Sequence, residues 1–150
     1  MNASTKRMIF AILFLLSLTS PEGQAQKVST AKREVLVESN HSWNGTKYTH
    51  YPSGVPQLTV LKLTIAPHSA LPWHTHPIPN TCYVLSGELT VHDKQSGKSV
   101  TYHQGQAFAE SVDRVHRGET GKAPTVLIIT YAGTAGLPTS ISVKGELPEY

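Results

Sequence analysis

Short runs of β-branched and aromatic residues, each closed by Gly, Pro, Asn or Ser, follow one another from Lys32 onward without helical periodicity. The 11 Gly and 10 Pro of the 150 residues provide the turns between them. This pattern predicts a single all-β domain, a sandwich, a jelly roll or a small barrel, and excludes a helical bundle or a coiled coil. The runs expected to form strands are Glu34–Val37, Leu58–Ile65, Leu71–His76, Thr81–Leu85, Glu88–His92, Lys98–His103, Ala107–Glu110 and Thr125–Tyr131.

Alternation within these runs predicts which side chains are buried. Leu61, Leu63 and Ile65 share one strand face, opposite Lys62 and Thr64, so that face is expected to be buried and the other solvated. The four residues 94–97, Lys-Gln-Ser-Gly, separate two of the runs and predict a hairpin whose glycine takes a positive φ.

The N-terminus has the layout of a secretory signal peptide. Lys6 and Arg7 precede an apolar run of 11 residues, 8–18, which is shorter than the ~20 residues of a membrane-spanning helix, so an uncleaved anchor is the weaker interpretation. Cleavage between Ala25 and Gln26 would leave an exported chain, periplasmic or extracellular, with no remaining membrane attachment. The expected organisation is a signal peptide (1–25), an N-terminal arm with an edge strand (26–57), a barrel core (58–133) and an irregular C-terminal arm (134–150).

Charge and cysteine content exclude several classes of function. The formal charge of +3 falls to +2 when the signal is removed, and no Lys/Arg run exceeds two residues, so a nucleic-acid partner is not expected. Cys82 is the only cysteine, which excludes a disulfide framework and a CxxC zinc module. The chain has eight histidines, so a metal site would have to be built from imidazoles.

His74 and His76 stand two residues apart in an expected strand. A strand directs both side chains to one face with their Cα atoms ~6–7 Å apart, which suits two ligands of one metal ion. A third histidine from another strand would leave positions open for water or substrate. Two histidines on a solvated strand face are also common, so this pair alone is weak evidence for a metal.

The spacing around the pair resembles the cupin superfamily over roughly Leu58 to Tyr131. In its first motif, G-x5-H-x-H-x3-4-E-x6-G, the matching positions here are His68, His74, His76, Asn80 and Gly87. In the second, G-x5-P-x-G-x2-H-x3-N, they are Gly105, Ser111, Asp113, His116 and Thr120. The resemblance implies a double-stranded β-helix, the jelly-roll barrel of small single-domain microbial cupins, and a homodimer.

The resemblance further implies a divalent transition metal, Fe, Zn, Ni, Mn or Cu, held by His74, His76 and His116. Asn80 stands where these proteins have glutamate, so it is either an optional fourth ligand or a hydrogen-bond partner of water at the metal. A neutral ligand set would leave the ion its full charge and favour anionic substrates. His68 and Asp113 replace turn glycines, and both residue types tolerate a positive φ.

Strand parity adds residues to the expected barrel interior. If Asn80 points inward, Cys82 and Val84 do as well, and with Phe108 they are candidates for a substrate pocket. Cys82 is interpreted first as a small buried wall residue and second as a reactive thiol or ligand. Glu110 is a weak catalytic candidate, with an exposed salt bridge in a turn the preferred alternative.

Two classes of function remain open. The first is a metal-dependent enzyme acting on a small molecule in the barrel mouth, by dioxygenase chemistry with Fe or Cu or by lyase or isomerase chemistry with Zn, Ni or Mn. The second is a cupin that holds a metal or small ligand without turnover. A metal-free structural barrel is the remaining alternative.

Overall fold

Residues 29–150 are described by the computed structural model, and residues 34–150 form one unit with its own core. The predicted signal peptide, residues 1–25, lies outside the described residues. In the short stretch before this unit, the Ser29 hydroxyl donates a hydrogen bond to the Ala31 carbonyl at 3.0 Å. Among the described residues, no helix is long and apolar enough to span a membrane.

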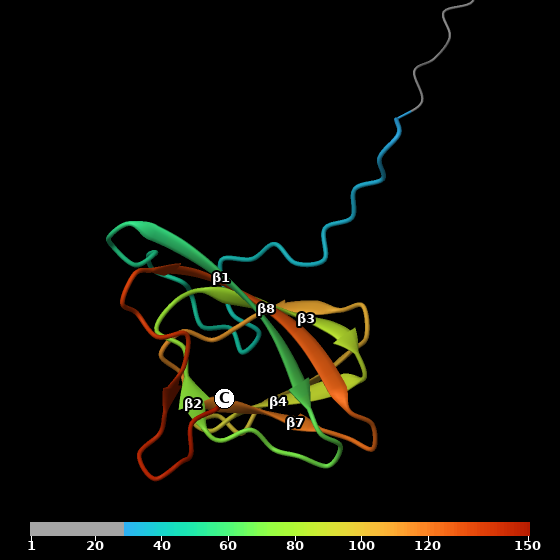
Figure 1. Cartoon of the computed structure of the whole chain (residues 1–150), viewed down its shortest axis with the longest axis vertical. Coiled ribbons are helices and arrows are strands. Elements are labelled where there is room, and N and C mark those ends of the chain that lie inside the picture. Colours follow the sequence, from blue (N-terminus) through green and yellow to red (C-terminus); the bar gives the residue numbers. More distant parts are fainter. Residues whose placement is uncertain (1–28) are drawn as a thin grey trace, which may run out of the picture. The chain divides into compact units, whose positions relative to one another are not determined.

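Two antiparallel sheets make up residues 34–150, and no helix occurs in the described chain (Figure 1). The first sheet has the strand order β1-β8-β3-β6 and the second β5-β4-β7-β2-β9. This is the predicted all-β, jelly-roll class. The strands are β1 (Pro56–Ile65), β2 (His74–Thr75), β3 (Asn80–Ser86), β4 (Glu88–Asp93), β5 (Ser99–His103), β6 (Ala107–Ala109), β7 (His116–Thr120), β8 (Thr125–Thr134) and β9 (Ile141–Ser142).

The long pair β1–β8 follows the predicted alternation. The two strands pair without a register shift from Pro56↔Thr134 to Ile65↔Thr125. Leu61 and Leu63 are partly buried and Ile65 is buried, whereas the intervening Lys62 and Thr64 are exposed. The inward side chains therefore contribute to the core, and the outer face of β1 meets solvent.

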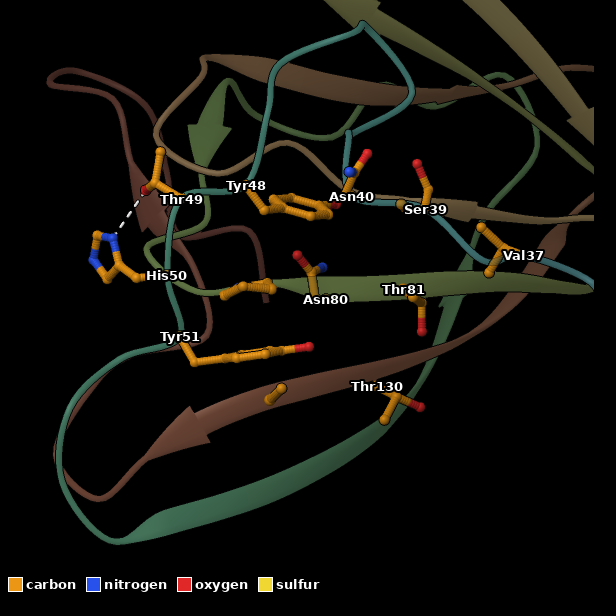
Figure 2. A pocket seen from close by; sticks show the side chains of 13 residues that line it. Val37, Ser39, Asn40, Tyr48, Thr49, His50, Tyr51, Asn80, Thr81 and Thr130 are labelled. Atoms are coloured by element: carbon orange, nitrogen blue, oxygen red, sulfur yellow. Dashed lines mark hydrogen bonds between the residues drawn. The ribbon is translucent and has the colours of Figure 1, made fainter.

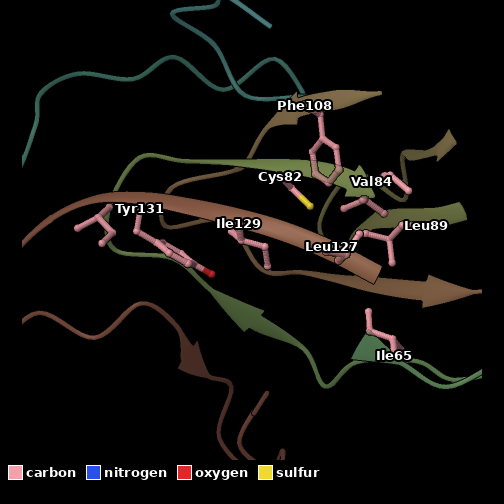
Figure 3. Packing of buried hydrophobic residues seen from close by; sticks show 10 residues of the cluster. Ile65, Cys82, Val84, Leu89, Phe108, Leu127, Ile129 and Tyr131 are labelled. Carbon is pink, nitrogen blue, oxygen red and sulfur yellow. The ribbon is translucent and has the colours of Figure 1, made fainter. Parts of the chain in front are cut away.

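The core lies between the two sheets (Figure 3). Cys82 and Val84 of β3 and Tyr131 of β8 are completely buried, which confirms the predicted inward parity of β3. The remaining buried hydrophobic members of this cluster are Ile65, Ile78, Leu89, Val91, Phe108, Leu127 and Ile129. Leu89, Val91, Leu127 and Ile129 of this core also line a small cavity that reaches His74 and His116.

Turns take the predicted backbone conformations. Gly97 closes the β4–β5 hairpin with a φ of 70°. The Asp93 carboxylate supports this hairpin by accepting hydrogen bonds from the backbone N–H groups of Gln95 and Ser96 at 2.9 and 2.7 Å. His68 and Asp113 have positive φ values of 50° and 54°, as expected for residues at turn positions where cupins have glycine.

Three expectations about the elements need correction. Glu34–Val37 forms no strand, since Val35 and Leu36 are 49% and 50% exposed and no described strand pairs with them. Strand β7 was not predicted, because its inward residues are His116, Gly118 and Thr120 rather than apolar side chains. The expected strand 71–76 is regular only at His74 and Thr75.

The segment after Thr134, expected to be irregular, contributes strand β9. Ile141 and Ser142 pair with Thr75 and His74 of β2. The backbone N–H of Val143 also donates to the Trp73 carbonyl at 3.0 Å. This pairing holds the C-terminal part of the described chain against β2, which contains His74 and ends one residue before His76.

Candidate metal centre

Three histidines from two neighbouring strands meet at one end of the barrel. His74 lies in β2 directly opposite His116, the first residue of β7, and His76 follows one residue after β2 ends. The three side chains are buried, and their candidate ligand atoms all lie within 4.8 Å of one another. The ring centroids are 4.6 to 5.0 Å apart. The structure thus brings together the three histidines that the cupin resemblance implies.

Backbone carbonyls orient all three rings. Each Nδ1 lies within hydrogen-bond distance of a carbonyl oxygen: 2.8 Å for His74 to Pro72, 2.7 Å for His116 to Arg114, and 2.7 Å for His76 to Thr139. A neutral imidazole that donates Nδ1–H to a carbonyl keeps its lone pair on Nε2. This is the arrangement by which proteins usually orient histidine ligands toward a metal.

Two buried carboxylates complete the cluster. Glu110 Oε2 lies 3.4 Å from His116 Nε2, and Glu149 Oε1 lies 3.3 Å from His74 Nε2. The side chains of the two glutamates are only 8% and 3% exposed. The preferred interpretation of Glu110 as an exposed salt bridge in a turn is therefore wrong. It follows β6 directly, and its side chain turns inward, whereas Arg114 from the same turn pairs with Asp93 at 3.6 Å.

Burial and mutual repulsion keep two of the histidines uncharged. Desolvation, aided by the neighbouring His116 and His76, lowers the pKa of His74 from 6.5 to about 3. Desolvation and His116 lower the pKa of His76 to about 4, although Glu110 acts in the opposite direction. Neutral imidazoles are the form that binds metal ions.

The carboxylates respond to the same surroundings in different ways. Burial disfavours charge on both Glu110 and His116, but their contact outweighs burial, lowering the pKa of Glu110 and raising that of His116. For Glu149, burial dominates and raises the pKa from 4.5 to about 7.

This donor set fits a divalent transition metal. Within the cluster, His116 Nε2 and Glu110 Oε2 are buried with only their mutual contact of 3.4 Å, and Glu149 Oε2 is buried without a hydrogen bond. Buried polar atoms normally have partners, and a cation held by the three histidines would lie close to these atoms. Imidazole with carboxylate is a common ligand combination for Zn, Fe, Ni, Mn and Cu. His74, His76 and His116 would hold such an ion, with the two glutamates beside it.

A family model described as "Cupin domain" matches residues 61–131, which extend from within β1 into β8 and include the three histidines. The chain belongs to the cupin superfamily. No curated protein gives a significant match to this cupin.

Solved structures share the fold at low sequence identity. A chain from the crystal structures of the DMSP lyases RdDddP and RnDddQII is 22% identical, with a TM-score of 0.51, over 58% of this cupin and 44% of that chain. The polyketide cyclase RemF from Streptomyces resistomycificus is 20% identical, with a TM-score of 0.51, over 64% of this cupin and 66% of the RemF chain. Lactobacillus farciminis oxalate decarboxylase, solved as a formate complex, is 16% identical, with a TM-score of 0.51, over 57% of this cupin and 26% of the decarboxylase chain. The match thus spans less than half of the DMSP lyase chain.

Asn80 lines a cavity of about 540 Å³ between the sheet β1-β8-β3-β6 and the N-terminal arm. Figure 2 shows its amide on the side of β3 that faces Tyr48 and Asn40, with Thr81 pointing the other way. The Asn80 side chain is buried, and neither amide atom has a hydrogen-bond partner. Its predicted role as an optional fourth ligand stays a prediction.

The residues assigned to a substrate pocket lie in the core of the cupin. Cys82, Val84 and Phe108 belong to the hydrophobic cluster. None of them lines the cavity of about 10 Å³ that borders His74 and His116. Burial raises the pKa of the Cys82 thiol well above its usual value, so the thiol is protonated. The interpretation of Cys82 as a small buried wall residue agrees with this placement.

Glu149 was missed by sequence reasoning. It is a single acidic residue in a segment interrupted by Gly145 and Pro148, far in sequence from both cupin motifs. No periodicity or spacing links it to the histidines. Only the pairing of β9 with β2 reveals that this segment returns to the site.

Proposed function

We propose that this cupin is a metal-dependent enzyme acting on a small organic molecule, with a divalent transition metal held by His74, His76 and His116. The observation that carries the proposal is the convergence of three buried imidazoles whose Nδ1 atoms are all held by backbone carbonyls. When bound, such an ion polarises a carbonyl or carboxylate oxygen of the substrate. The identity of the ion, Fe, Zn, Ni, Mn or Cu, is left to experiment.

Lyase or isomerase chemistry is the reaction class that the residues support best. Glu110 places a buried carboxylate oxygen 3.4 Å from His116 Nε2, so it lies beside any substrate group held there. Glu110 would accept a proton from a substrate carbon, and the electron pair of the broken C–H bond would form a double bond. The leaving group then departs with its own electron pair in a lyase, or the proton returns at another carbon in an isomerase. The names lyase, decarboxylase and cyclase among the structural neighbours agree with this class.

A non-catalytic metal-binding protein is the second candidate, favoured by the size of the cavity beside the triad. That cavity measures about 10 Å³ and is lined in part by His74, His116, Glu110 and Glu149. A single water needs roughly 10–15 Å³, so the cavity as it stands holds an ion or a water and no organic substrate.

Metal content separates a metal centre from a metal-free barrel. The chain, purified without an affinity tag, should contain about one transition-metal ion, which His76→Ala and His116→Ala should lose. The matched control is His103→Ala, because His103 is exposed on β5. Unchanged metal content in both triad variants would refute the proposed site.

Activity separates the enzyme from the binding protein. The metal-loaded chain should convert members of a panel of hydroxy acids, keto acids, phenols and β-diketones, and Glu110→Gln should retain the metal but lose turnover by roughly 10²-fold or more. Oxygen uptake during turnover would assign the dioxygenase branch instead. Stoichiometric metal with no turnover on any compound would favour the binding protein.

We also propose export to the periplasm or the extracellular space and assembly as a homodimer. The basic residues and apolar run at 6–18 support export. The intact mass of the secreted protein should correspond to a chain that starts at Gln26. A mass that includes residues 1–25 would contradict cleavage.

A further inference from the structure

The segment that follows β9 returns to the triad and places a carboxylate against it. Glu149 Oε1 lies 3.3 Å from His74 Nε2, with both side chains 3% exposed. The other oxygen, Oε2, is buried without a hydrogen bond, although the Ser140 side chain lies near enough to the carboxylate to lower its pKa. Residues 146–150 are called the closing segment below, and the chain end marked in Figure 1 lies close to β2. The carboxylate therefore lies beside the three histidines whose ligand atoms are within 4.8 Å of one another, without being part of that group.

The closing segment is held in place by few interactions. The Tyr150 hydroxyl lies 3.1 Å from the Tyr131 hydroxyl and 3.0 Å from Thr139 Oγ1. At the other end, the Glu146 N–H donates to the Val143 carbonyl at 2.9 Å. Leu147, between these anchors, is 79% exposed. Each such hydrogen bond contributes only about 1 kcal/mol net, and the buried contact of Glu149 with His74 adds to them.

Glu110 differs from Glu149 in how firmly its backbone is held. It comes directly after β6, and its N–H donates to the Asn80 carbonyl at 3.0 Å. That anchors Glu110 to the middle of the first sheet. Glu110 is therefore tied to a sheet through its backbone, whereas Glu149 lies seven residues beyond the last strand.

The closing segment also accounts for the small cavity. Glu149 is part of the lining of the 10 Å³ space beside His74 and His116. An organic substrate can reach the histidines only if a lining group moves, and Glu149 is a lining residue that lies outside the strands. The group that takes its place must suit the surroundings of a metal ion held by the histidines.

We propose that Glu149 is a displaceable carboxylate ligand that closes the metal centre, and that the substrate is a small carboxylate that takes its position. This inference rests on the proposed function, because it requires a metal at the triad. Exchange of one carboxylate for another leaves the charge of the centre unchanged. Replacement of Glu149 by a neutral substrate would instead leave a buried positive charge without its counter-charge, which is unfavourable. The bound substrate then lies beside Glu110.

The inference is tested on the full chain loaded with Co²⁺, with acetate as the probe carboxylate and the visible Co²⁺ spectrum as the readout. Glu149→Gln should weaken Co²⁺ binding by roughly 10-fold, the range found when a group supporting a metal ligand is removed. Glu149→Ala should bind acetate at least ~10-fold more tightly than the unmodified chain, because its position is vacant. Glu146→Gln is the matched control, an exposed glutamate of the same segment, and should change neither value.

Tyr150→Phe tests displacement with Glu149 intact. It removes the hydroxyl that meets Tyr131 and Thr139, so acetate should bind a few-fold more tightly while Co²⁺ affinity changes less than in Glu149→Gln. A purely structural role of Glu149 would alter stability but not acetate affinity.

The outcomes distinguish this inference from the proposed function. If Co²⁺ binds and depends on His76 but the Glu149 variants match the unmodified chain in both affinities, only the role of Glu149 is overturned. If the unmodified chain binds no Co²⁺, or His76→Ala still binds it, the proposed function fails and this inference fails with it.

Discussion

The three histidines of the triad differ from His92 and His103 in the groups that contact their ring nitrogens. His74, His76 and His116 have Nδ1 against a backbone carbonyl, which leaves Nε2 free to face the shared centre. His92 and His103 instead contact carboxylates on the outer surface, Glu119 and Glu88, at 3.2 and 3.3 Å. The histidines therefore divide into ligand candidates and residues that contact carboxylates outside the site.

At the residue scale, the depressed histidine pKa values predict how the metal-free protein responds to acid. The pKa of His76 falls from 6.5 to about 4 on folding, so its contribution to stability is present above pH 6.5 and is lost as the pH falls through 4. A shift of this size corresponds to roughly 3 kcal/mol. Glu149, with its raised pKa, acts in the opposite sense, losing its contribution as the pH rises from 4.5 through about 7.

Denaturant unfolding in the presence of a chelator, between pH 7.5 and 4, measures this effect. The free energy of unfolding of the unmodified chain should fall more steeply below pH 6.5 than that of His76→Gln, which cannot titrate. His103→Gln should follow the unmodified chain, since His103 is exposed. Parallel curves for His76→Gln and the unmodified chain would show that His76 does not titrate as described.

At the scale of the elements, Gly87 and Gly97 form a matched pair at the two ends of β4. Both have positive φ, 80° and 70°. A Cβ at Gly87 would lie 2.5 Å from the Pro124 carbonyl oxygen, whereas a Cβ at Gly97 would have no atom within 4 Å. Gly97→Ala should therefore cost only the left-handed backbone strain, about 1–2 kcal/mol. Gly87→Ala should cost clearly more, because a backbone atom has to move.

Urea unfolding of the two alanine variants tests this difference. We expect Gly97→Ala to fold with a modest loss of stability and Gly87→Ala to be the less stable by at least ~1 kcal/mol. Equal losses would mean that the turn joining β3 to β4 does not pack against the start of β8 as described.

Sequence patterns predicted those elements whose inward residues are apolar. The alternation of Leu61, Leu63 and Ile65 identified β1, and the parity of Cys82 and Val84 identified the inner face of β3. β7 was missed because a histidine, a glycine and a threonine point inward there. At the site, motif spacing was sufficient for the three histidines, whereas the inward placement of Glu110 and Glu149 depends on tertiary packing that no local pattern records.

At the scale of the whole molecule, the outer face of β1 predicts self-association. Leu58 and Val60 are 75% and 64% exposed on this edge strand, and Tyr51 and Val55, which precede it, are 73% and 78% exposed. Apolar surface on an edge strand favours pairing with a second copy. Analytical ultracentrifugation should show a dimer, and Val60→Lys should shift it toward the monomer. Thr101→Lys, exposed on the other sheet, is the control. A monomeric unmodified chain would contradict this assembly.

The central claim is that three imidazoles from β2, its C-terminal flank and β7 hold one metal ion. X-ray absorption fine structure at the edge of the bound metal tests it most directly, because it reports the kind and number of ligand atoms. We expect three imidazole nitrogens at about 2.0–2.2 Å together with carboxylate or water oxygen. Fewer than three imidazoles, or a sulfur ligand from Cys82, would contradict it.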